Sequence, residues 1–528
     1  MSRLRVLFAL VLLAFVTVAT HVATAAEQDP WSLLASSSFD DVRDGVTLLA
    51  REGDARALPV ISALQDGKLL VARDGTLVIR GPDDGLVDAK TGAKYSGPST
   101  GLKRARVNNA VRSAMDDALG MLRLFAPDSA QRIQAADAVF HSHDPRSIPA
   151  LDRALAKEQN AAARRAMEQA RAACELFNPQ ASDADKLAAI HILRDRGGME
   201  SRSLLDGMSK SDPTVGAAAA SAVHAIDRDL QFWSVVQGIY FGISLGSVLL
   251  LAAAGLAITF GVMGVINMAH GELVMLGAYT TFVVQQALGA QFAGLGLVLS
   301  IPAAFLVSGL AGVIIERLLI SRLYGRPLET LLATWGLSLI LQQGVRTIFG
   351  ASNRGVLTPD WLSGEMRLGG LSLTYNRLAI IIFAAVVFFA LMAVLRFTPL
   401  GLRMRAVTQN RLMAASMGIR TTWIDALTFG LGAGVAGMAG VALSQIDNVS
   451  PNLGQGYIID SFLVVVFGGA GNLWGTALGA LTLGIVNKFL EPVAGAVLGK
   501  IAVLVMVILF IQRKPRGLFP LRGRAVEA

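Results

Sequence analysis

The sequence predicts an all-α polytopic membrane domain, preceded by a secreted, mainly helical domain with a small β-hairpin. Three observations support this fold class. Hydrophobic residues make up 53% of the 528 positions and charged residues 16%, whereas soluble domains carry about a quarter charged residues. The charges are concentrated in residues 27–230, and residues 231–512 are apolar with scattered glycines. The N-terminus, in turn, has the pattern of an export signal.

That export signal is read from three features in order. Arg3 and Arg5 precede an apolar run over 6–18, and the ATA tripeptide at 23–25 fits a small-residue cleavage site. This pattern predicts a secretory signal peptide; the alternative is an uncleaved membrane anchor. Both place the next domain outside the cytoplasm. The predicted domains are the signal peptide (1–25), a periplasmic domain (26–230), the membrane domain (231–512) and a cytoplasmic tail (513–528).

The secreted domain is predicted to be a stack of short helices. The segments GDARALPVISAL (53–64) and HDPRSIPALDRAL (143–155) share an Arg, an apolar residue and a Pro in register. Such spacing suggests a HEAT-like repeat. Between them, KLLVARDGTLVIRGPDDG alternates apolar and polar residues around Asp74-Gly75, which predicts a β-hairpin. The sequence does not identify a ligand for this domain, and a platform for a binding protein is one hypothesis.

The membrane domain divides into about seven to nine spans, since one crossing needs about 20 apolar residues. Arginines cluster in the loops 316–326 and 396–420 and again after residue 512. The positive-inside rule makes these segments cytoplasmic, which predicts a multi-pass protein of the bacterial inner membrane. One crossing separates loop 316–326 from loop 349–377, so the latter is expected outside the cytoplasm, although it carries three arginines. The expected spans lie near 233–262, 272–290, 293–315, 328–348, 378–396, 424–443 and 494–512, with a shorter Gly-interrupted pair over 458–490.

Several functional classes are disfavoured by the sequence. Cys174 is the single cysteine, which excludes an intrachain disulfide and a CxxC metal site. The net charge of +8 resides in short loops, so it does not indicate a nucleic-acid partner. GAVLGKI (495–501) is an incomplete phosphate-binding loop, and we find no catalytic, metal or cofactor motif. The GxGxxG pattern at 432–437 lies within an apolar span, where small residues favour helix packing over dinucleotide binding.

Two glycine-rich stretches interrupt the apolar spans. They are TFGVMGVINMAHGE (259–272) and VFGGAGNLWG (466–475), one in each half of the membrane domain. Irregular backbone at membrane depth requires surrounding protein or a water-filled cavity. Paired breaks in corresponding positions predict a transport pathway. The candidate pathway residues are Asn267, His270, Gly271, Glu272, Gly468, Gly469, Gly471 and Asn472.

Glu272 is the only formally charged residue between positions 231 and 315. A carboxylate ionised at mid-bilayer costs on the order of 3 kcal/mol or more. We therefore expect it to face protein, water or the membrane boundary, near the cytoplasmic end of the first span. Two roles stay open. Glu272 can support the start of the next helix, where the helix dipole favours it, with Asn267 and His270 bonding the broken backbone, or these side chains can gate the pathway.

Three segments resemble a known family. GLAITFGVMGVINMAHGELVMLGAY and YIIDSFLVVVFGGAGNLWGTALGALTLGIVNKFLEP resemble two membrane signatures of branched-chain amino-acid-type ABC importer permeases. IQRKPRGLFP resembles their C-terminal end. Within that family, the long secreted domain, DALTFGLGAGVAGMAG, NVSPNLGQGYIIDSFLVVVFGG and NKFLEPVAGAVLGKI resemble the urea-transport permease subunit. The resemblance implies a permease that translocates urea. Branched-chain amino acids or short amides are the alternative substrates, and a membrane-anchored sensor or scaffold is the alternative class.

The resemblance also implies partners for this chain. They are a second homologous membrane subunit, two cytoplasmic ABC ATPase subunits that hydrolyse ATP, and a periplasmic substrate-binding protein. The ATPases of such importers dock on a Glu-Ala-Ala…Gly loop, for which Met413 replaces the Glu here. A short amphipathic helix is expected within 397–423, with Met404, Val407, Leu412, Ala415 and Met417 on one apolar face. The docking candidates are Arg411, Ala414, Ala415 and Gly418.

Overall fold

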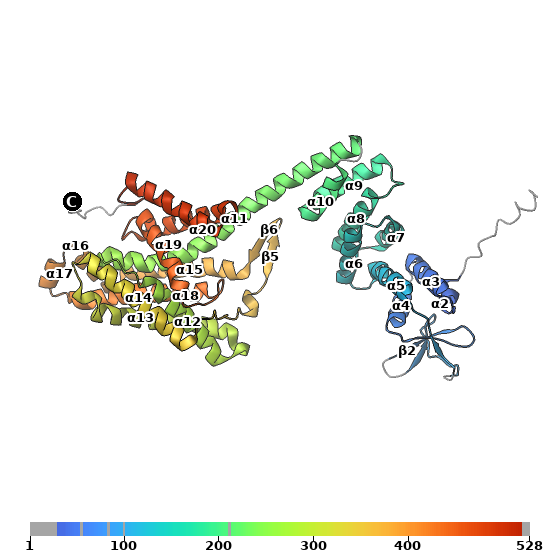
Figure 1. The fold of residues 1–528 in the computed structure, drawn as a ribbon, viewed down its shortest axis with the longest axis horizontal. Helices are drawn as coiled ribbons and strands as arrows, with labels where there is room; N and C mark the ends of the chain where they lie inside the picture. Colours follow the sequence, from blue (N-terminus) through green and yellow to red (C-terminus); the bar gives the residue numbers. More distant parts are fainter. Residues whose placement is uncertain (1–28, 53–55, 82–84, 99–100, 210–212, 520–528) are drawn as a thin grey trace, which may run out of the picture. The chain divides into compact units, whose positions relative to one another are not determined.

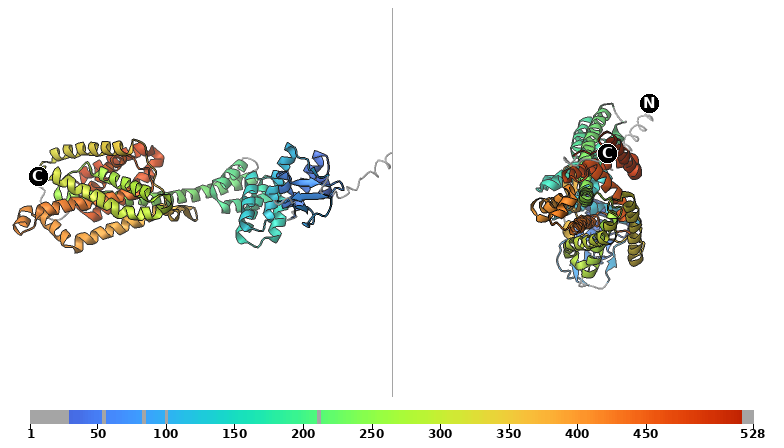
Figure 2. Two further views of the ribbon diagram at one scale, coloured as in Figure 1. Left: turned by 90° about the horizontal axis from the view of Figure 1, so that it is seen from below. Right: turned by 90° about the vertical axis from the view of Figure 1, so that its left-hand side faces the viewer.

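The computed structural model describes residues 29–52, 56–81, 85–98, 101–209 and 213–519. The predicted signal peptide, as well as Arg522 and Arg524 of the tail, lie outside these ranges. The chain forms two compact units that divide between Leu230 and Gln231, and both are mostly helical (Figures 1 and 2).

The N-terminal unit combines short helices with a small sheet. Its helices are α2 (Pro30–Leu34), α3 (Phe39–Glu52), α4 (Ala57–Gln65), α5 (Asn109–Leu122), α6 (Ser129–Ser142), α7 (Ile148–Lys157), α8 (Ala161–Leu176), α9 (Asp183–Arg196) and α10 (Gly198–Met208), with the 3-10 turns η1 (Arg123–Phe125) and η2 (Pro145–Ser147). Its strands are β1 (Leu69–Val71), β2 (Leu77–Arg80), β3 (Leu86–Asp88) and β4 (Lys103–Arg104). Helix α11 (Pro213–Met263) begins in this unit and continues into the second.

The predicted hairpin is present as β1 and β2, which pair antiparallel with Leu69 opposite Ile79. Its turn is fixed by Asp74, whose carboxylate accepts a hydrogen bond from the Thr76 amide at 3.1 Å, and by Gly75 at φ 85°. The hairpin is part of a four-stranded sheet with the order β3-β2-β1-β4. The helices pack around two apolar cores, one before and one after residue 123. The HEAT-like repeat stays a prediction.

The second unit, which we call the membrane unit, is almost entirely helical. Its further elements are α12 (His270–Leu288), α13 (Ala293–Leu318), α14 (Pro327–Phe349), α15 (Tyr375–Phe397), α16 (Pro399–Gln409), α17 (Arg411–Ser416), α18 (Thr421–Leu443), α19 (Leu453–Gly468) and α20 (Leu473–Arg513), the turns η3 (Ala290–Phe292), η4 (Ile320–Arg322) and η5 (Asp360–Leu362), and the hairpin strands β5 (Glu365–Leu368) and β6 (Leu371–Thr374). Gly495, at φ 78°, breaks α20 into two helices.

Five of the described helices are long and apolar enough to cross a membrane by length and composition: α11, α13 with its flanking turns, α15, α18 and α20. Helices α12 and α14, both expected as spans, are not among the five. Helix α14 turns its small polar residues inward and leaves large apolar residues such as Leu332 and Ile340 exposed. That inverted pattern suits a helix whose outer face contacts lipid, where polar groups must find partners inside the protein.

Glycines allow the helices at the centre of the membrane unit to pack closely. A Cβ atom at Gly432 would lie 2.6 Å from the Gly255 carbonyl oxygen of α11, and one at Gly434 would overlap Phe305 of α13. A Cβ atom at Gly437 would overlap Ser308, also on α13. The GxGxxG pattern therefore serves helix packing, as predicted from its position within an apolar span.

The described arginines of the three predicted clusters lie at one end of the membrane unit, which we call the arginine-rich end. The Arg317 guanidinium lies 4.6 Å from the Trp423 ring, and that of Arg411 lies 4.9 Å from the Tyr324 ring. Helices α16 and α17 also lie here (Figure 1). The β5–β6 hairpin lies at the opposite end, where the Tyr240 hydroxyl donates to the Thr374 carbonyl at 2.9 Å.

Candidate functional site

Helix α12 begins inside the membrane unit rather than at its edge. His270, its first residue, is buried, and its Nε2 lies 2.9 Å from the Ala252 carbonyl of α11. Ala252 precedes Met263, the end of α11, by about 17 Å along the helix. The chain after Met263 therefore turns back, and residues 264–269 are non-helical, with Gly264 at φ 66°. The first predicted break is present.

Glu272 consequently lies deeper than expected. Its carboxylate accepts hydrogen bonds from Ser338 Oγ at 3.0 Å and from Gln342 Nε2 at 2.7 Å. These two α14 residues lie about 17 and 23 Å along the helix from its start at the arginine-rich end. The expected position near the end of the first span is wrong, because residues 264–269 carry the chain back inward before α12 begins.

The residues that hold Glu272 belong to a polar stripe that sequence reasoning missed. Thr330, Thr334, Ser338 and Gln342 recur every four residues along α14, and all four are buried. Thr334 Oγ1 accepts a hydrogen bond from the Met268 amide at 3.1 Å, so the stripe also supports the broken segment. The four-residue interval was the available signal, because it places these residues on one helix face.

Three buried polar atoms in the broken segment have no hydrogen-bond partner. They are Asn267 Nδ2, His270 Nδ1 and Glu272 Oε2, each on a side chain with 1% exposure. The Ala252 carbonyl can only accept, so Nε2 of His270 carries the hydrogen and Nδ1 is an acceptor. Buried polar groups are usually paired. The segment can therefore offer one amide donor and two acceptors to water or a small solute.

A second helix begins at the same place. A Cβ atom at Gly454, in the first turn of α19, would overlap the Gly271 carbonyl and lie 2.9 Å from the Glu272 amide nitrogen. Helix α19 runs toward the arginine-rich end, whereas α12 runs to the opposite end, where Gln285 Nε2 donates to the Leu357 carbonyl at 2.9 Å. Two helix N-termini, both carrying partial positive charge, thus meet in the interior. Sequence reasoning missed Gly454, although the NLGQG segment (452–456) offered a glycine signal.

The second predicted break lies elsewhere. Gly468 ends α19 at the arginine-rich end, about 21 Å along the helix from Gly454. Gly469 (φ 107°) and Gly471 (φ 82°) have left-handed backbones, and Asn472 caps α20 by accepting from the Trp474 amide at 3.1 Å. The C-terminal segment closes this break, because the amides of Leu518 and Phe519 donate to the carbonyls of Phe467 (2.9 Å) and Gly468 (3.1 Å).

The structure therefore separates the eight predicted pathway residues into two groups. Asn267, His270, Gly271 and Glu272 lie together in the interior, at the start of α12. Gly468, Gly469, Gly471 and Asn472 form a capped turn at the arginine-rich end. The two breaks still touch, since a Cβ atom at Gly261 would lie 2.5 Å from the Cα atom of Gly471.

A small cavity adjoins the first break. Its volume is about 100 Å³, and it lies between the end of α11, the broken segment and α19. Asn267 is the one polar residue among those that line it. Its apolar lining consists of Leu256, Phe260, Ile266, Met268, Ile458, Ile459, Phe462 and Val465. The cavity can accommodate a small apolar group.

The predicted docking loop forms two helices rather than one. Asn410 ends α16 and caps α17 by accepting from the Met413 amide at 2.9 Å. Met404 and Val407 are therefore buried on α16, whereas Leu412 on α17 and Met417 at its C-cap are exposed. The expected single apolar face is wrong because the cap at Asn410 interrupts the helix.

The four docking candidates have different surroundings. Ala414 is buried, Ala415 is exposed, and Gly418 follows the C-cap of α17 with φ 83°. Arg411 points back into the membrane unit, where it pairs with the buried carboxylate of Asp425. Exposed Leu412, Met413 and Met417 were not proposed as a contact surface, although they form the apolar tip of α17.

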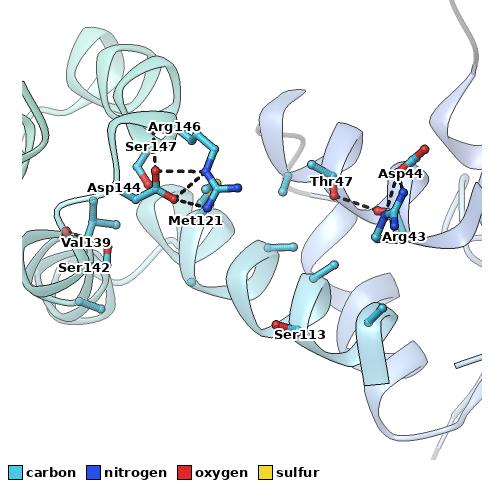
Figure 3. A pocket seen from close by; sticks show the side chains of 16 residues that line it. Arg43, Asp44, Thr47, Ser113, Met121, Val139, Ser142, Asp144, Arg146 and Ser147 are labelled. Carbon is cyan, nitrogen blue, oxygen red and sulfur yellow. Dashed lines mark hydrogen bonds and ion pairs between the residues drawn. The ribbon is translucent and has the colours of Figure 1, made fainter. Parts of the chain in front are cut away.

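The N-terminal unit has a separate groove, shown in Figure 3. Its volume is about 610 Å³, and side chains of α3, α5, α6 and η2 line it. Arg43 is bonded to Asp44 at 3.0 Å, and Arg146 Nη2 lies 2.7 Å from the Asp144 carboxylate. The side-chain hydrogen bond from Arg146 lowers the pKa of Asp144. The groove therefore presents paired rather than single-sign charges.

These observations define the class of protein first. A helical unit with apolar outer faces contains a helix that begins in its interior, beside a buried carboxylate and unpaired polar atoms. Such an arrangement is typical of membrane proteins that transport solutes. Residues 238–512 match the family described as the permease component of branched-chain amino acid transport systems. The match covers more than half of the 528 residues, so the chain belongs to this family.

The relatives match about half of this chain. The chain is 30% identical over 298 residues to the high-affinity branched-chain amino acid transport system permease protein LivH of Escherichia coli K12. It is 29% identical over 296 residues to the corresponding protein BraD of Pseudomonas aeruginosa. Both alignments cover 96% of the relative but 54% of this chain, which leaves most of the N-terminal unit without a counterpart. No solved structure shows a significant match.

Proposed function

We propose that this chain is the permease subunit of an ATP-driven importer and that its solute passes the start of α12. The supporting observation is the group of unpaired atoms on Asn267, His270 and Glu272, all buried within one broken segment. A passing solute with N–H donors and a carbonyl acceptor would pair with them at little cost, since these atoms have no hydrogen-bond partner in the structure. Ser338 and Gln342 hold the Glu272 carboxyl group in the interior.

Urea is the substrate that we propose. It is small and neutral, and its two amino groups and carbonyl suit the acceptors and the donor of the broken segment. The signature segments of the membrane unit resemble urea-type permeases, and the additional N-terminal unit distinguishes this chain from the matched amino acid permeases.

Branched-chain amino acids are the second candidate, and the comparisons support them better. LivH and BraD carry this substrate in their names. The cavity of about 100 Å³ with a largely apolar wall would also suit part of an aliphatic side chain. The two candidates differ in charge and shape, so uptake measurements separate them.

The proposed assembly is the one that the resemblance to ABC importer permeases implies. A second membrane subunit, two ABC ATPases and a periplasmic substrate-binding protein complete the importer. The arginine-rich end would face the cytoplasm under the positive-inside rule, and the exposed apolar tip of α17 would contact an ATPase. The groove of the N-terminal unit is the proposed platform for the binding protein.

Uptake of labelled urea, leucine and acetamide tests the substrate, in cells that lack this chain and in cells that regain it. Restored urea uptake without leucine uptake supports the proposal. Leucine uptake without urea uptake would show that the substrate is an amino acid. If neither urea nor leucine is taken up, the proposal that this chain transports them fails. Glu272→Gln and His270→Ala should lower uptake while the subunit still assembles, as checked by co-purification. Normal transport by both variants would exclude the start of α12 as the pathway.

A further inference from the structure

A second contact between α12 and α14 lies two helical turns beyond Glu272. Tyr279 follows Glu272 by seven residues on α12, and on α14 Phe349 follows Gln342 by the same interval. The rings of Tyr279 and Phe349 pack 4.7 Å apart. Seven residues make about two turns, or about 10 Å, so each ring lies on the same helix face as the residue that it follows. The ring pair therefore closes the seam between α12 and α14 that holds Glu272, on the side away from the arginine-rich end.

The hydroxyl group of Tyr279 is buried without a hydrogen-bond partner. Tyr279 is only 3% exposed, and buried tyrosine hydroxyls usually find a partner. Tyr240, which is also buried, follows that rule, because its hydroxyl donates to the Thr374 carbonyl at 2.9 Å. Along α12, unpaired buried polar atoms therefore occur at His270, Glu272 and Tyr279.

The segment that follows α14 holds Phe349 in place. Arg354 Nη2 donates a hydrogen bond to the Phe349 carbonyl at 2.7 Å, and the Arg354 guanidinium lies 6.0 Å from the Phe282 ring of α12. Further along the chain, the Leu357 amide donates to the Gln285 side chain of α12 at 2.9 Å. The segment is thus attached to α12 at two levels and keeps Phe349 against Tyr279.

We propose that Tyr279 and Phe349 form a gate on the solute pathway: Phe349 closes the seam between α12 and α14, and the Tyr279 hydroxyl binds the solute when the seam opens. The inference rests on the proposed function, because it assumes that the solute passes Glu272. Separating the two rings breaks no side-chain hydrogen bond, since the Tyr279 hydroxyl has none. A hydroxyl can donate to a carbonyl and accept from an N–H group. A small solute with an amide group would therefore bind at Tyr279 and then move about 10 Å inward to Glu272.

Tyr279→Phe tests the hydroxyl in whole-cell uptake of labelled urea, or of labelled leucine where only leucine is taken up. The variant keeps the ring against Phe349 and removes a group that bonds to nothing in the closed seam, so its thermal stability should not fall. We expect the solute concentration for half-maximal uptake to rise about 2- to 10-fold, the effect of one hydrogen bond. Tyr240→Phe is the matched control, because it removes a paired hydroxyl at the same end; it should lower stability and leave that concentration unchanged. An unchanged concentration for Tyr279→Phe would overturn the role of its hydroxyl.

Thiol labelling tests the closure by Phe349. Val345 is buried on α14, one turn from both Gln342 and Phe349 on the same face. Val345→Cys is introduced after Cys174→Ala removes the native thiol, and isolated membranes are treated with a small charged methanethiosulfonate. We expect Phe349→Ala to raise the labelling rate of Val345→Cys several-fold. Val387→Cys, which is buried on α15, is the control for general loosening and should label at the same rate with and without Phe349→Ala. Equal labelling of Val345→Cys in both backgrounds would overturn the closure by Phe349.

The two measurements separate this inference from the proposed function. If the unaltered chain takes up urea or leucine but Tyr279→Phe and Phe349→Ala change neither uptake nor labelling, the gate fails and the proposed function stands. If neither solute is taken up and Phe349→Ala still exposes Val345→Cys, the proposed function fails, whereas the closure of the seam by Phe349 stands.

Discussion

Gln342 donates a hydrogen bond to Glu272 at 2.7 Å, and this contact joins the polar stripe of α14 to the start of α12. Ser338 adds a second donor to the same carboxylate oxygen at 3.0 Å. The other oxygen of Glu272 is buried without a partner. Helix α14 therefore fixes the carboxylate in one orientation and leaves one of its oxygens available.

Gln342→Leu should lower both stability and uptake. Glu272 would keep Ser338 as its only donor, and removing one partner of a buried polar group costs about 1–3 kcal/mol. Thermal unfolding in detergent and solute uptake in whole cells measure the two effects. Gln343→Leu is the matched control, because Gln343 is the exposed neighbour on the same helix. Equal behaviour of the two variants would mean that Gln342 does not support Glu272.

Gly454→Ala should separate the two helix starts. Its Cβ atom would overlap the Gly271 carbonyl, and overpacking of this kind costs typically about 1–3 kcal/mol. Because the site lies beside Glu272, we expect uptake to fall more than expression. Gly456→Ala is the control, since a Cβ atom there would meet nothing within 4 Å. If Gly454→Ala transports normally, close contact between α12 and α19 is not required.

The division into a charged half and an apolar half was accessible from composition, because the bilayer imposes long apolar segments. The break before Glu272 was also accessible, because glycines and a lone carboxylate interrupt such a segment. Its depth was not. Residues 264–269 turn inward, and that direction depends on His270 meeting Ala252, a contact across 18 positions in the chain.

The second break was predicted at 466–475, whereas the second helix that starts in the interior begins near Gly454, for a related reason. Gly468, Gly469 and Gly471 give the denser glycine signal, but a turn and a pathway both need glycine, and the sequence does not distinguish them. The distinguishing contacts come from Leu518 and Phe519, far along the chain, whose amides bond to the carbonyls of Phe467 and Gly468 at the turn. The α14 stripe was missed because hydropathy averages its four small polar residues with the apolar residues between them.

Leu412→Asp should uncouple the ATPases. Leu412 is 82% exposed at the tip of α17, at the arginine-rich end, and burying an unpaired carboxylate in an apolar contact is strongly unfavourable. We expect loss of ATPase co-purification and of stimulated hydrolysis, with similar but smaller losses for charges at Ala415 or Gly418. Leu328→Asp is the matched control, because Leu328 is also 82% exposed and begins α14 at the same end. Equal losses from both leucines would place docking elsewhere.

Arg411 should matter for stability rather than for direct contact with an ATPase. It pairs with Asp425, which is fully buried. Removing one partner of a buried pair costs about 3–5 kcal/mol, and we expect a value near the lower limit because Arg411 itself is partly exposed. Arg411→Met should lower the unfolding temperature, and adding Asp425→Leu should restore most of it. A double-mutant cycle without coupling would show that the pair does not contribute.

The Arg132–Glu158 pair should make the N-terminal unit acid-sensitive. Glu158 is almost fully buried and its Oε2 lies 2.6 Å from Arg132 Nε. The hydrogen bond from Arg132 lowers the pKa of Glu158 below its usual 4.5. A carboxyl group whose folded pKa is depressed stabilises the fold above its unfolded pKa, and that stabilisation is lost as the pH falls through the folded value.

We therefore expect protease resistance of the N-terminal unit, measured on the full chain, to fall below about pH 4.5. Glu158→Gln should weaken resistance at pH 7 and remove part of the pH dependence, because the amide that replaces the carboxylate has no charge to lose. Glu168→Gln, at an exposed position of α8, is the control and should leave the profile unchanged. A profile for Glu158→Gln as steep as that of the unaltered chain would assign the acid sensitivity to other carboxylates.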